Sequence, residues 1–328
     1  MSLINDIRTR AIKSAKKIVL PESDDPRTIE AIDFILDKKI AKIILIAKED
    51  SKKSIKSKNL NDLQIIDPQN YKDTDAMVSE YYEMRKSKGM TAEEAGGIVR
   101  KDYLTFGALL VRRGLADGFV AGANHTTPDV IRAALRCLSI DKNIGVISGA
   151  FLMEIPNSPY GDNGAFIFAD CGVNPEPNAR QLAGIAVSNA DLFKKLTAGH
   201  TPRVAFLSYS SKGSAEGPLV EKMREAVTRA KEASPGLLVD GEFQVDSAIV
   251  PEVAKIKCAA SDVAGKANVL IFPDLNSGNI SYKLTQRLAN ARAIGPLLTG
   301  FTKPCSDLSR GCFVEDIVDA VAVTAIRS

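Results

Sequence analysis

The sequence predicts an α/β protein of two domains, each with a largely parallel sheet. Short β-branched and apolar runs alternate with amphipathic helical patterns along nearly all of the 328 residues, which is typical of βαβ units. Many runs are apolar throughout, as expected for strands buried on both faces of a parallel sheet. The chain is also long for a single domain.

Each expected strand is a short apolar run that ends at polar or turn-forming residues. The runs are KKIVLP (16–21), AKIILIA (41–47), LQIID (63–67), DGFVAGA (117–123), GVISGAFLME (145–154), AFIFAD (165–170), RVAFLSYS (203–210), ANVLIFPD (267–274) and IGPLLTGF (294–301). The expected helices between them are residues 24–38, 102–114, 127–139, 177–197, 214–232, 276–290 and 313–327. Turn formers at 155–164 (IPNSPYGDNG) predict an exposed hairpin or loop.

The last helix has a clear apolar face. Val314, Ile317, Val318, Val321 and Ala325 fall on it, whereas Glu315, Asp316 and Asp319 are expected off it. Asp316 is therefore expected to point toward solvent or a polar cleft.

Composition excludes several classes of function. The net charge of +3 is small for this length and does not predict a nucleic-acid surface. No run reaches the ~18 apolar residues of a membrane span, and no apolar signal segment follows the basic N-terminus. The five cysteines lack disulfide or zinc spacing, so we expect no bound metal and a cytoplasmic protein with reduced thiols. With two histidines, a Ser–His–Asp triad is not expected.

The usual nucleotide-binding motifs are absent, but several glycine- and serine-rich turns feed helices. Neither GxGxxG nor GxxxxGK[ST] occurs. Helix N-termini bind anions, and open α/β folds place ligands at the carboxyl ends of strands. Basic residues in or just after these turns therefore predict a cleft for an anionic substrate. The turns lie in 122–135, 208–223, 272–288 and 306–318, and the basic residues are Lys212, Lys283, Arg287 and Arg310.

Ordinary helix chemistry explains part of this pattern. Thr127 before Pro128 is a good N-cap, and Asp316 in a first turn complements the helix dipole. Arg287, late in a helix, is favoured at a C-terminus. Arg310 is different, because the dipole of the following helix repels a cation.

Longer stretches resemble a known family. PCSDLSRGCFVEDIV (304–318) resembles the C-terminal signature of the phosphate acetyltransferase (phosphotransacetylase) family, and FPDLNSGNISYKLTQRLA (272–289) resembles its other strong block. YYEMRKSKGMTAEEA (81–95), GANHTTPDVIRAAL (122–135) and FIFADCGVNPEP (166–177) resemble further blocks, in the same order. The resemblance runs from about residue 12 to the C-terminus. The segment 155–164 matches no pattern of the family.

The resemblance implies fold, reaction and assembly. It implies reversible acetyl transfer between acetyl phosphate and coenzyme A, in a cleft between two α/β domains like those of isocitrate and isopropylmalate dehydrogenases. The first domain is then residues 1–144 plus 295–328, and the second is residues 145–294. It implies a homodimer acting on small molecules, with coenzyme A as co-substrate, no tightly bound cofactor, and no nucleic-acid or membrane partner.

The resemblance also implies roles for single residues. Asp316 is the base that takes the coenzyme A thiol proton, Ser309 stabilises the tetrahedral transition state, and Arg310 binds the phosphoryl oxygens. The thiol pKa is about 8.5 and that of a free Asp about 3.9, so burial or concerted transfer is needed. The substrate-binding candidates are Arg287 in the active site, Arg85 and Arg132 for the coenzyme A phosphates, Lys283 and Asn279 for acetyl phosphate, and Thr127.

Three alternatives remain open. The chain could prefer butyryl or another short acyl phosphate, because the sequence does not define pocket size. It could be a non-catalytic module that binds acyl-CoA, although Ser309, Arg310 and Asp316 are retained. It could be a dehydrogenase, although no nicotinamide fingerprint is present.

Overall fold

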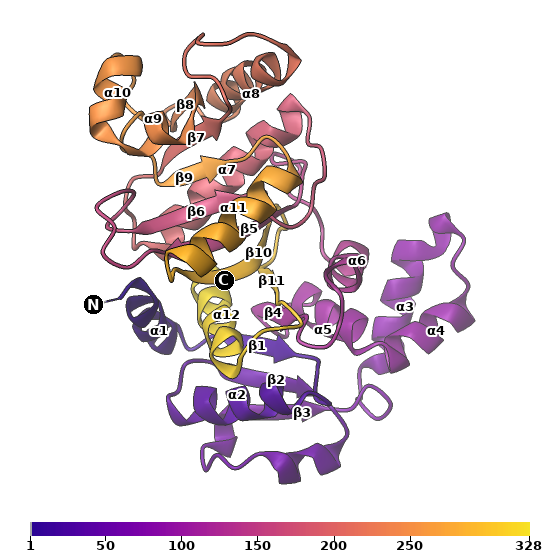
Figure 1. Cartoon of the computed structure of the whole chain (residues 1–328). Helices are drawn as coiled ribbons and strands as arrows, with labels where there is room; N and C mark the ends of the chain where they lie inside the picture. Colours follow the sequence, from indigo (N-terminus) through magenta and orange to yellow (C-terminus); the bar gives the residue numbers. More distant parts are fainter. Residues whose placement is uncertain (1) are drawn as a thin grey trace. The chain divides into compact units, whose positions relative to one another are not determined.

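The chain folds into two compact α/β units. The computed structural model describes residues 2–328. Unit 1 combines the chain up to Ser139 with Phe301–Ser328, and unit 2 is Ile140–Gly300. In Figure 1, unit 1 is therefore drawn in two colours: indigo to magenta for its N-terminal part and yellow for the C-terminal segment.

Unit 1 contains a parallel sheet. The strand order is β3-β2-β1-β4-β11, and each neighbouring pair is parallel. The strands are β1 (Lys17–Leu20), β2 (Lys42–Ile46), β3 (Leu63–Ile66), β4 (Gly118–Ala121) and β11 (Cys305–Asp307). Because β1 leads to β2 on one side while β4 lies on the other, the connections change direction between β1 and β4. Such switch points, at the carboxyl ends of strands, are where open α/β sheets bind ligands.

Helices cover the sheet of unit 1 on both faces. α12 and α5 both contact β1 and β4 but belong to separate layers, with α1 and α2 beside α12 and α6 beside α5 (Figure 1). The helices are α1 (Leu3–Ser14), α2 (Pro26–Asp37), α3 (Thr74–Arg85), α4 (Ala92–Lys101), α5 (Tyr103–Arg112), α6 (Thr127–Cys137) and α12 (Val314–Arg327). Short 3₁₀ turns η1 (Glu49–Ser54), η2 (Leu60–Asp62) and η3 (Lys86–Lys88) complete the unit.

The last helix buries one residue that the pattern placed outside. Ile317, Val318 and Val321 are buried as predicted, but so is Asp319, with no exposed surface. Its carboxylate accepts a hydrogen bond from Arg8 Nε on α1 at 2.7 Å. The prediction for Asp319 is wrong because an ion pair with α1 compensates a buried charge, and helical periodicity does not reveal such a partner.

Unit 2 has a mixed sheet in the order β10-β5-β6-β9-β7-β8. β5 pairs antiparallel with both β6 and β10, and the other neighbours are parallel. The strands are β5 (Ser148–Glu154), β6 (Ala165–Ala169), β7 (Arg203–Leu207), β8 (Leu238–Phe243), β9 (Val269–Ile271) and β10 (Arg292–Thr299). The helices are α7 (Ala179–Leu196), α8 (Pro218–Ala233), α9 (Val245–Ile249), α10 (Pro251–Lys257) and α11 (Leu275–Leu288).

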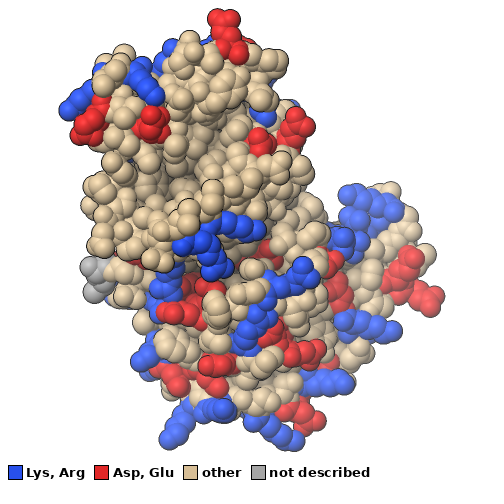
Figure 2. Space-filling view, in the orientation of Figure 1, with Lys and Arg blue, Asp and Glu red and all other residues tan. Residues whose placement is uncertain are grey.

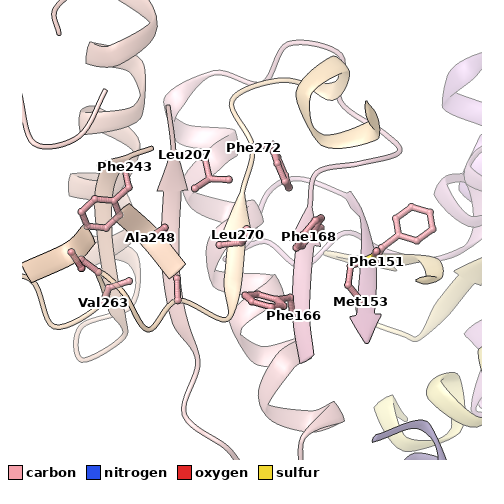
Figure 3. Packing of buried hydrophobic residues seen from close by; sticks show 14 of the residues in the cluster. Phe151, Met153, Phe166, Phe168, Leu207, Phe243, Ala248, Val263, Leu270 and Phe272 are labelled. Atoms are coloured by element: carbon pink, nitrogen blue, oxygen red, sulfur yellow. The ribbon is translucent and has the colours of Figure 1, made fainter. Parts of the chain in front are cut away.

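Aromatic side chains fill the core of unit 2. Phe166, Phe168 and Phe272 are each at most 6% exposed, and Phe243 and Leu270 lie in the same cluster (Figure 3). The 155–164 segment joins the antiparallel pair β5 and β6, so the predicted hairpin is confirmed.

The predicted fold class is confirmed, as is each apolar run predicted to form a strand. β8 and β11 were not predicted, and their strands carry acids: Asp240 and Glu242 in β8 and Asp307 in β11. α1, α3, α4, α9 and α10 were not among the expected helices either.

Candidate active site

The carboxyl ends of β1, β4 and β11 bring three turns together. β4 pairs with both other strands in parallel, so the chain leaves all three at the same edge of the sheet. The turns are residues 21–25 after β1, residues 122–126 after β4 and residues 308–313 after β11, and below they are called the β1–α2, β4–α6 and β11–α12 turns.

A buried glutamate shapes the β4–α6 turn. Glu22 is 3% exposed and accepts hydrogen bonds from the backbone N–H groups of Gly122, Ala123, Asn124 and His125 at 2.8–3.1 Å. The ring Nδ1 of His125 also lies 2.8 Å from Glu22 Oε1. These four donors therefore bind a carboxylate of the protein. They are therefore not available for a substrate anion, although the glycine-rich pattern alone had indicated that they would be.

Asp307 lies directly beneath this turn. It has no exposed surface, and its Oδ2 accepts a hydrogen bond from Thr127 Oγ1 at 2.5 Å. Its Oδ1 faces Gly122, where a Cβ atom would come within 2.3 Å of it. Burial raises the pKa of Asp307 to about 7, against the opposing hydrogen bonds from Thr127 and Leu308, and the nearby Glu22 charge adds to the rise.

Thr127, a predicted N-cap, is instead the first residue of α6. Thr126 is the N-cap, and its hydroxyl accepts a hydrogen bond from the Asp129 N–H. The helix begins one residue earlier than a cap at Thr127 requires, which leaves the Thr127 hydroxyl free to reach Asp307.

The β11–α12 turn presents the predicted catalytic residues. Ser309 and Arg310 are exposed, and Asp316 is half-buried in the first turn of α12. Ser309 Oγ accepts a hydrogen bond from the Gly311 N–H at 3.2 Å. Within residues 2–328, no side chain or backbone group pairs with the Arg310 guanidinium. The turn therefore holds out a hydroxyl and an unpaired cation to solvent.

Asp316 uses one of its two carboxylate oxygens in helix capping. Oδ2 accepts a hydrogen bond from the Phe313 N–H at 2.8 Å, as an acid in a first helical turn often does. Oδ1 has no hydrogen-bond partner among residues 2–328. The cap fixes the orientation of the carboxylate and leaves one oxygen available for a proton.

Cys312 is a buried thiol in the same turn. It is 6% exposed, and burial raises its pKa to about 11 although the Arg27 charge opposes the rise. The thiol therefore stays protonated at neutral pH, and a protonated thiol is a weak nucleophile. All five cysteines are free and buried.

Arg85 lies in a basic pocket of about 560 Å³ between α3, α4 and α6. Arg85, Lys88, Lys101 and Arg136 line it, with Glu94 as the acid among its lining residues. The Nε of Arg85 is buried and has no hydrogen-bond partner within the described chain. An unpartnered buried donor in a basic pocket favours an anionic ligand.

Arg132 is exposed on α6 and pairs with Asp129 at 2.7 Å between Nη1 and Oδ1. This i,i+3 surface pair is weak, so the guanidinium can exchange Asp129 for a stronger anion.

In unit 2, α11 carries the remaining predicted residues. Gly278 lets the helix approach the sheet closely, since a Cβ atom there would lie 2.1 Å from Asp170 O. Tyr282 stacks on Phe151 with 3.9 Å between ring centroids. Asn279 Nδ2 donates to Cys171 O at 3.1 Å, so this amide also anchors the helix.

Lys283 and Arg287 lie one turn apart on the exposed face of α11. Lys283 Nζ lies 5.5 Å from the centre of the Tyr282 ring, and Arg287 has no hydrogen-bond or ion-pair partner among residues 2–328. Lys212, in contrast, pairs with Asp240 at 2.5 Å and donates to Gly241 O. Lys212 is therefore held by an ion pair and a backbone hydrogen bond.

Sequence reasoning missed Glu22, Arg27 and Asp307, which hold these turns in place. The sequence held one usable signal for Asp307: this acid directly follows Cys305 and Ser306 and precedes a glycine-containing turn. Glu22 and Arg27 lie in PESDDPR (21–27), which reads as an ordinary helix start.

Among residues 2–328, no group of three or more His, Cys, Asp or Glu side chains is arranged to hold a metal ion. In the same range, every helix is too short or too polar to span a bilayer.

Comparison with known proteins gives consistent matches over the full chain. The family model described as phosphate acetyl/butaryl transferase matches residues 2–325. A phosphate acetyltransferase from Thermoanaerobacterium thermosaccharolyticum is 47% identical over 329 residues, covering 100% of both chains. The crystal structure of a phosphotransacetylase from Streptococcus pyogenes superposes with a TM-score of 0.91 at 41% identity, covering 99% of this chain and 97% of that one.

A more distant structure shares the fold alone. A putative 4-hydroxythreonine-4-phosphate dehydrogenase from Salmonella typhimurium has a TM-score of 0.52 at 10% identity, covering 95% of this chain and 98% of that one. The dehydrogenase-like part of the fold prediction is thereby confirmed. The full-length matches confirm the resemblance found in the sequence: this chain belongs to the phosphate acetyl/butaryl transferase family.

Proposed function

We propose that this chain transfers an acetyl group reversibly between acetyl phosphate and coenzyme A. The observation that carries the proposal is the β11–α12 turn together with the first turn of α12. Ser309, the unpaired Arg310 and Asp316, whose Oδ1 has no partner among residues 2–328, lie there within eight residues. The turn lies at the ligand-binding edge of a parallel sheet, and full-length relatives carry the name phosphate acetyltransferase.

The chemistry assigns one role to each of the three side chains. The coenzyme A sulfur attacks the acetyl carbonyl carbon while Asp316 Oδ1 takes the thiol proton. Ser309 donates to the carbonyl oxygen, which becomes negative in the tetrahedral transition state. Arg310 binds the phosphoryl oxygens, so the C–O bond breaks toward a neutralised phosphate. The S–C bond forms as phosphate leaves.

Direct transfer in a ternary complex requires no covalent intermediate on the protein. Cys312, the thiol of the same turn, is buried and has a pKa raised to about 11, mainly by burial. It is therefore a poor nucleophile, which favours coenzyme A itself as the attacking thiol. Coenzyme A acts as a co-substrate, and no tightly bound cofactor is needed.

Basic residues outside the turn supply substrate binding. In unit 1, Arg85 and Arg132 bind the phosphates of coenzyme A, and Arg85 does so from the basic pocket. In unit 2, Arg287 and Lys283 offer exposed cations to acetyl phosphate. Asn279 and Thr127 act less directly, because each already anchors its helix through one hydrogen bond.

A homodimer is the assembly that we propose, with α11 in its interface. Ile280, Leu284 and Leu288 are 56%, 52% and 80% exposed and recur every four residues, so they form one apolar stripe. On the face shown in Figure 2, the surface of unit 2 is mostly uncharged apart from a group of Lys and Arg side chains at α11 and charges at its far end, whereas unit 1 mixes both signs throughout. Charge-poor surfaces with large apolar side chains are typical of the buried centre of protein interfaces.

We also propose that the two units are the two domains of the chain. The observed change of unit at Ser139 and at Phe301 supports a first domain that the C-terminal segment completes. A cytoplasmic location is consistent with five free, reduced cysteines.

An absorbance assay of thioester formation tests the proposal. Purified protein is mixed with coenzyme A and acetyl, propionyl or butyryl phosphate, with a chelator present. We expect acetyl-CoA to form with the highest kcat/KM. A preference for butyryl phosphate would favour the other activity in the family name, and folded protein that binds acetyl-CoA without turnover would favour a regulatory module.

A further inference from the structure

We propose that Arg27 is a positioning residue for this reaction, which holds the β11–α12 turn in its active shape. The inference rests on the proposed acetyl transfer. Arg27 is the second residue of α2, where the helix dipole disfavours a cation. Its position there needs a compensating set of acceptors, and the structure supplies one.

All five N–H donors of the Arg27 guanidinium are used. Nε and Nη2 donate to the two carboxylate oxygens of Asp25 at 3.0 and 2.6 Å. The second Nη2 hydrogen goes to Ala123 O at 2.6 Å. Nη1 donates to Arg310 O at 2.9 Å and to Cys312 O at 2.8 Å. An arginine has five such donors, so none remains for a substrate and Arg27 acts through other residues.

These bonds join the three turns at the edge of the sheet. Asp25 belongs to the β1–α2 turn, Ala123 to the β4–α6 turn, and Arg310 and Cys312 to the β11–α12 turn. The pair with Asp25 is strong: the hydrogen bond from Arg27 holds the pKa of Asp25 below its usual value, although burial opposes this. Asp25 therefore fixes the position of the guanidinium, which in turn binds the other two turns.

Without Arg27, the β11–α12 turn keeps mostly local bonds. Ser309 accepts from the Gly311 N–H through Oγ and from the Cys312 N–H through its carbonyl oxygen. Those bonds close the turn on itself but do not orient it against the sheet. Loss of the two Arg27 bonds therefore lets Ser309 and the Arg310 side chain move relative to the substrate. A displacement of about 1 Å in an active site costs up to about 100-fold in rate.

The positioning role needs the planar fork of arginine. Lysine has the charge but donates from one nitrogen atom. It therefore cannot reach the Asp25 carboxylate and the three carbonyl oxygens at the same time. We therefore expect Arg27→Gln to lower kcat by about 10- to 100-fold and Arg27→Lys to recover only part of it. The KM for acetyl phosphate should rise because Arg310 moves. The KM for coenzyme A should stay within about twofold, because Arg85 and Arg132 lie on other helices.

The matched control is Arg112→Gln. Arg112 has similar exposure, 34% against 31%, and likewise joins a carboxylate, Glu80, to a backbone carbonyl, Cys137 O. It does not contact any of the three turns. Its loss should lower stability about as much as the Arg27 change while kcat stays at the wild-type value.

A second readout does not depend on activity. Limited trypsin digestion, followed by mass spectrometry, measures cleavage of the Arg310–Gly311 bond in the folded protein. Arg27→Gln should increase the cleavage rate at this bond at least several-fold, and Arg112→Gln should leave it unchanged. If wild-type protein makes no acetyl-CoA, the proposed function is wrong, and the digestion still tests whether Arg27 holds the turn.

Unchanged cleavage and unchanged kcat in Arg27→Gln would overturn the inference. Equal losses of kcat in Arg27→Gln and Arg112→Gln would also overturn it, because both would then act through global stability. If Arg27→Gln does not fold, Arg27→Lys decides by the same two measurements.

Discussion

The hydroxyl of Thr127 donates a hydrogen bond to the buried carboxylate of Asp307, with 2.5 Å between Oγ1 and Oδ2. The bond joins the start of α6 to the end of β11. It is not strong enough to keep the carboxylate ionised in its buried surroundings, because burial raises the pKa of Asp307 to about 7. This acid therefore titrates near neutral pH, directly beside the turn that carries Ser309 and Arg310.

The raised pKa predicts how stability depends on pH. In the unfolded chain Asp307 ionises near the ordinary aspartate pKa of 3.8, whereas in the folded protein it holds its proton up to about pH 7. The folded state thus binds more protons between these values, so the stabilisation is fully present below about pH 4 and is lost as pH rises through 7. The full loss is at most about 4 kcal/mol.

Asp307→Asn should remove this pH dependence, because an asparagine side chain does not titrate. Its amide oxygen can still accept the hydrogen bond from Thr127. Urea unfolding at several values between pH 5 and pH 8 should show wild-type stability falling relative to the variant as pH rises. Parallel stability curves for the two proteins would show that Asp307 does not titrate in this range.

Arg85→Ala and Arg132→Ala should mainly weaken coenzyme A binding. Removing a charge-assisted hydrogen bond costs about 1.5–3 kcal/mol, so the KM for coenzyme A should rise about 10- to 100-fold. The KM for acetyl phosphate should change much less, because loss of uniform binding appears in the KM of the substrate concerned. Arg229→Ala is the control, since this exposed arginine pairs with Glu225 on α8 as Arg132 pairs with Asp129 on α6. A collapse of kcat with an unchanged coenzyme A KM would contradict the assignment.

A charge in the apolar stripe of α11 should dissociate the proposed dimer. Leu284→Glu places a carboxylate in the middle of the stripe, between Ile280 and Leu288, where pairing would bury it without a partner. Sedimentation velocity should show a dimer for wild type and a monomer for the variant. Leu115→Glu, at an exposed leucine of unit 1, should remain dimeric. A monomeric wild type, or a Leu284→Glu protein that stays dimeric, would show that α11 is not the interface.

The elements that sequence reasoning found are those with a local signal. A continuous apolar run such as that of β2 is buried whatever its neighbours are, so the run alone is sufficient to predict a strand. β8 was missed because Asp240 and Glu242 interrupt its apolar pattern. Both acids are compensated by distant cations, Lys212 and Arg224.

The candidate site divides in the same way. Ser309, Arg310 and Asp316 could be predicted because they lie in one continuous stretch that resembles a family. Glu22 and Arg27 could not, because their partners lie 100 and 283 residues away along the chain. Only the parallel arrangement of β1, β4 and β11 brings those segments together.

The central claim is that Asp316 accepts the thiol proton in addition to capping α12. Asp316→Asn tests it, because asparagine retains an oxygen that accepts from the Phe313 N–H but is not a base. The neighbouring Glu315→Gln is the control: Glu315 lies in the same first turn and pairs with Arg8.

The decisive measurement is kcat for acetyl-CoA formation by Asp316→Asn, Glu315→Gln and wild type, each shown to be folded by its thermal transition. We expect Asp316→Asn to lose about 10²- to 10⁴-fold, the usual contribution of a general base. Part of the activity should return as pH rises and the thiol ionises unaided, while Glu315→Gln should stay close to wild type. A folded Asp316→Asn protein with near wild-type kcat and an unchanged pH profile would contradict the account and leave Asp316 with helix capping alone.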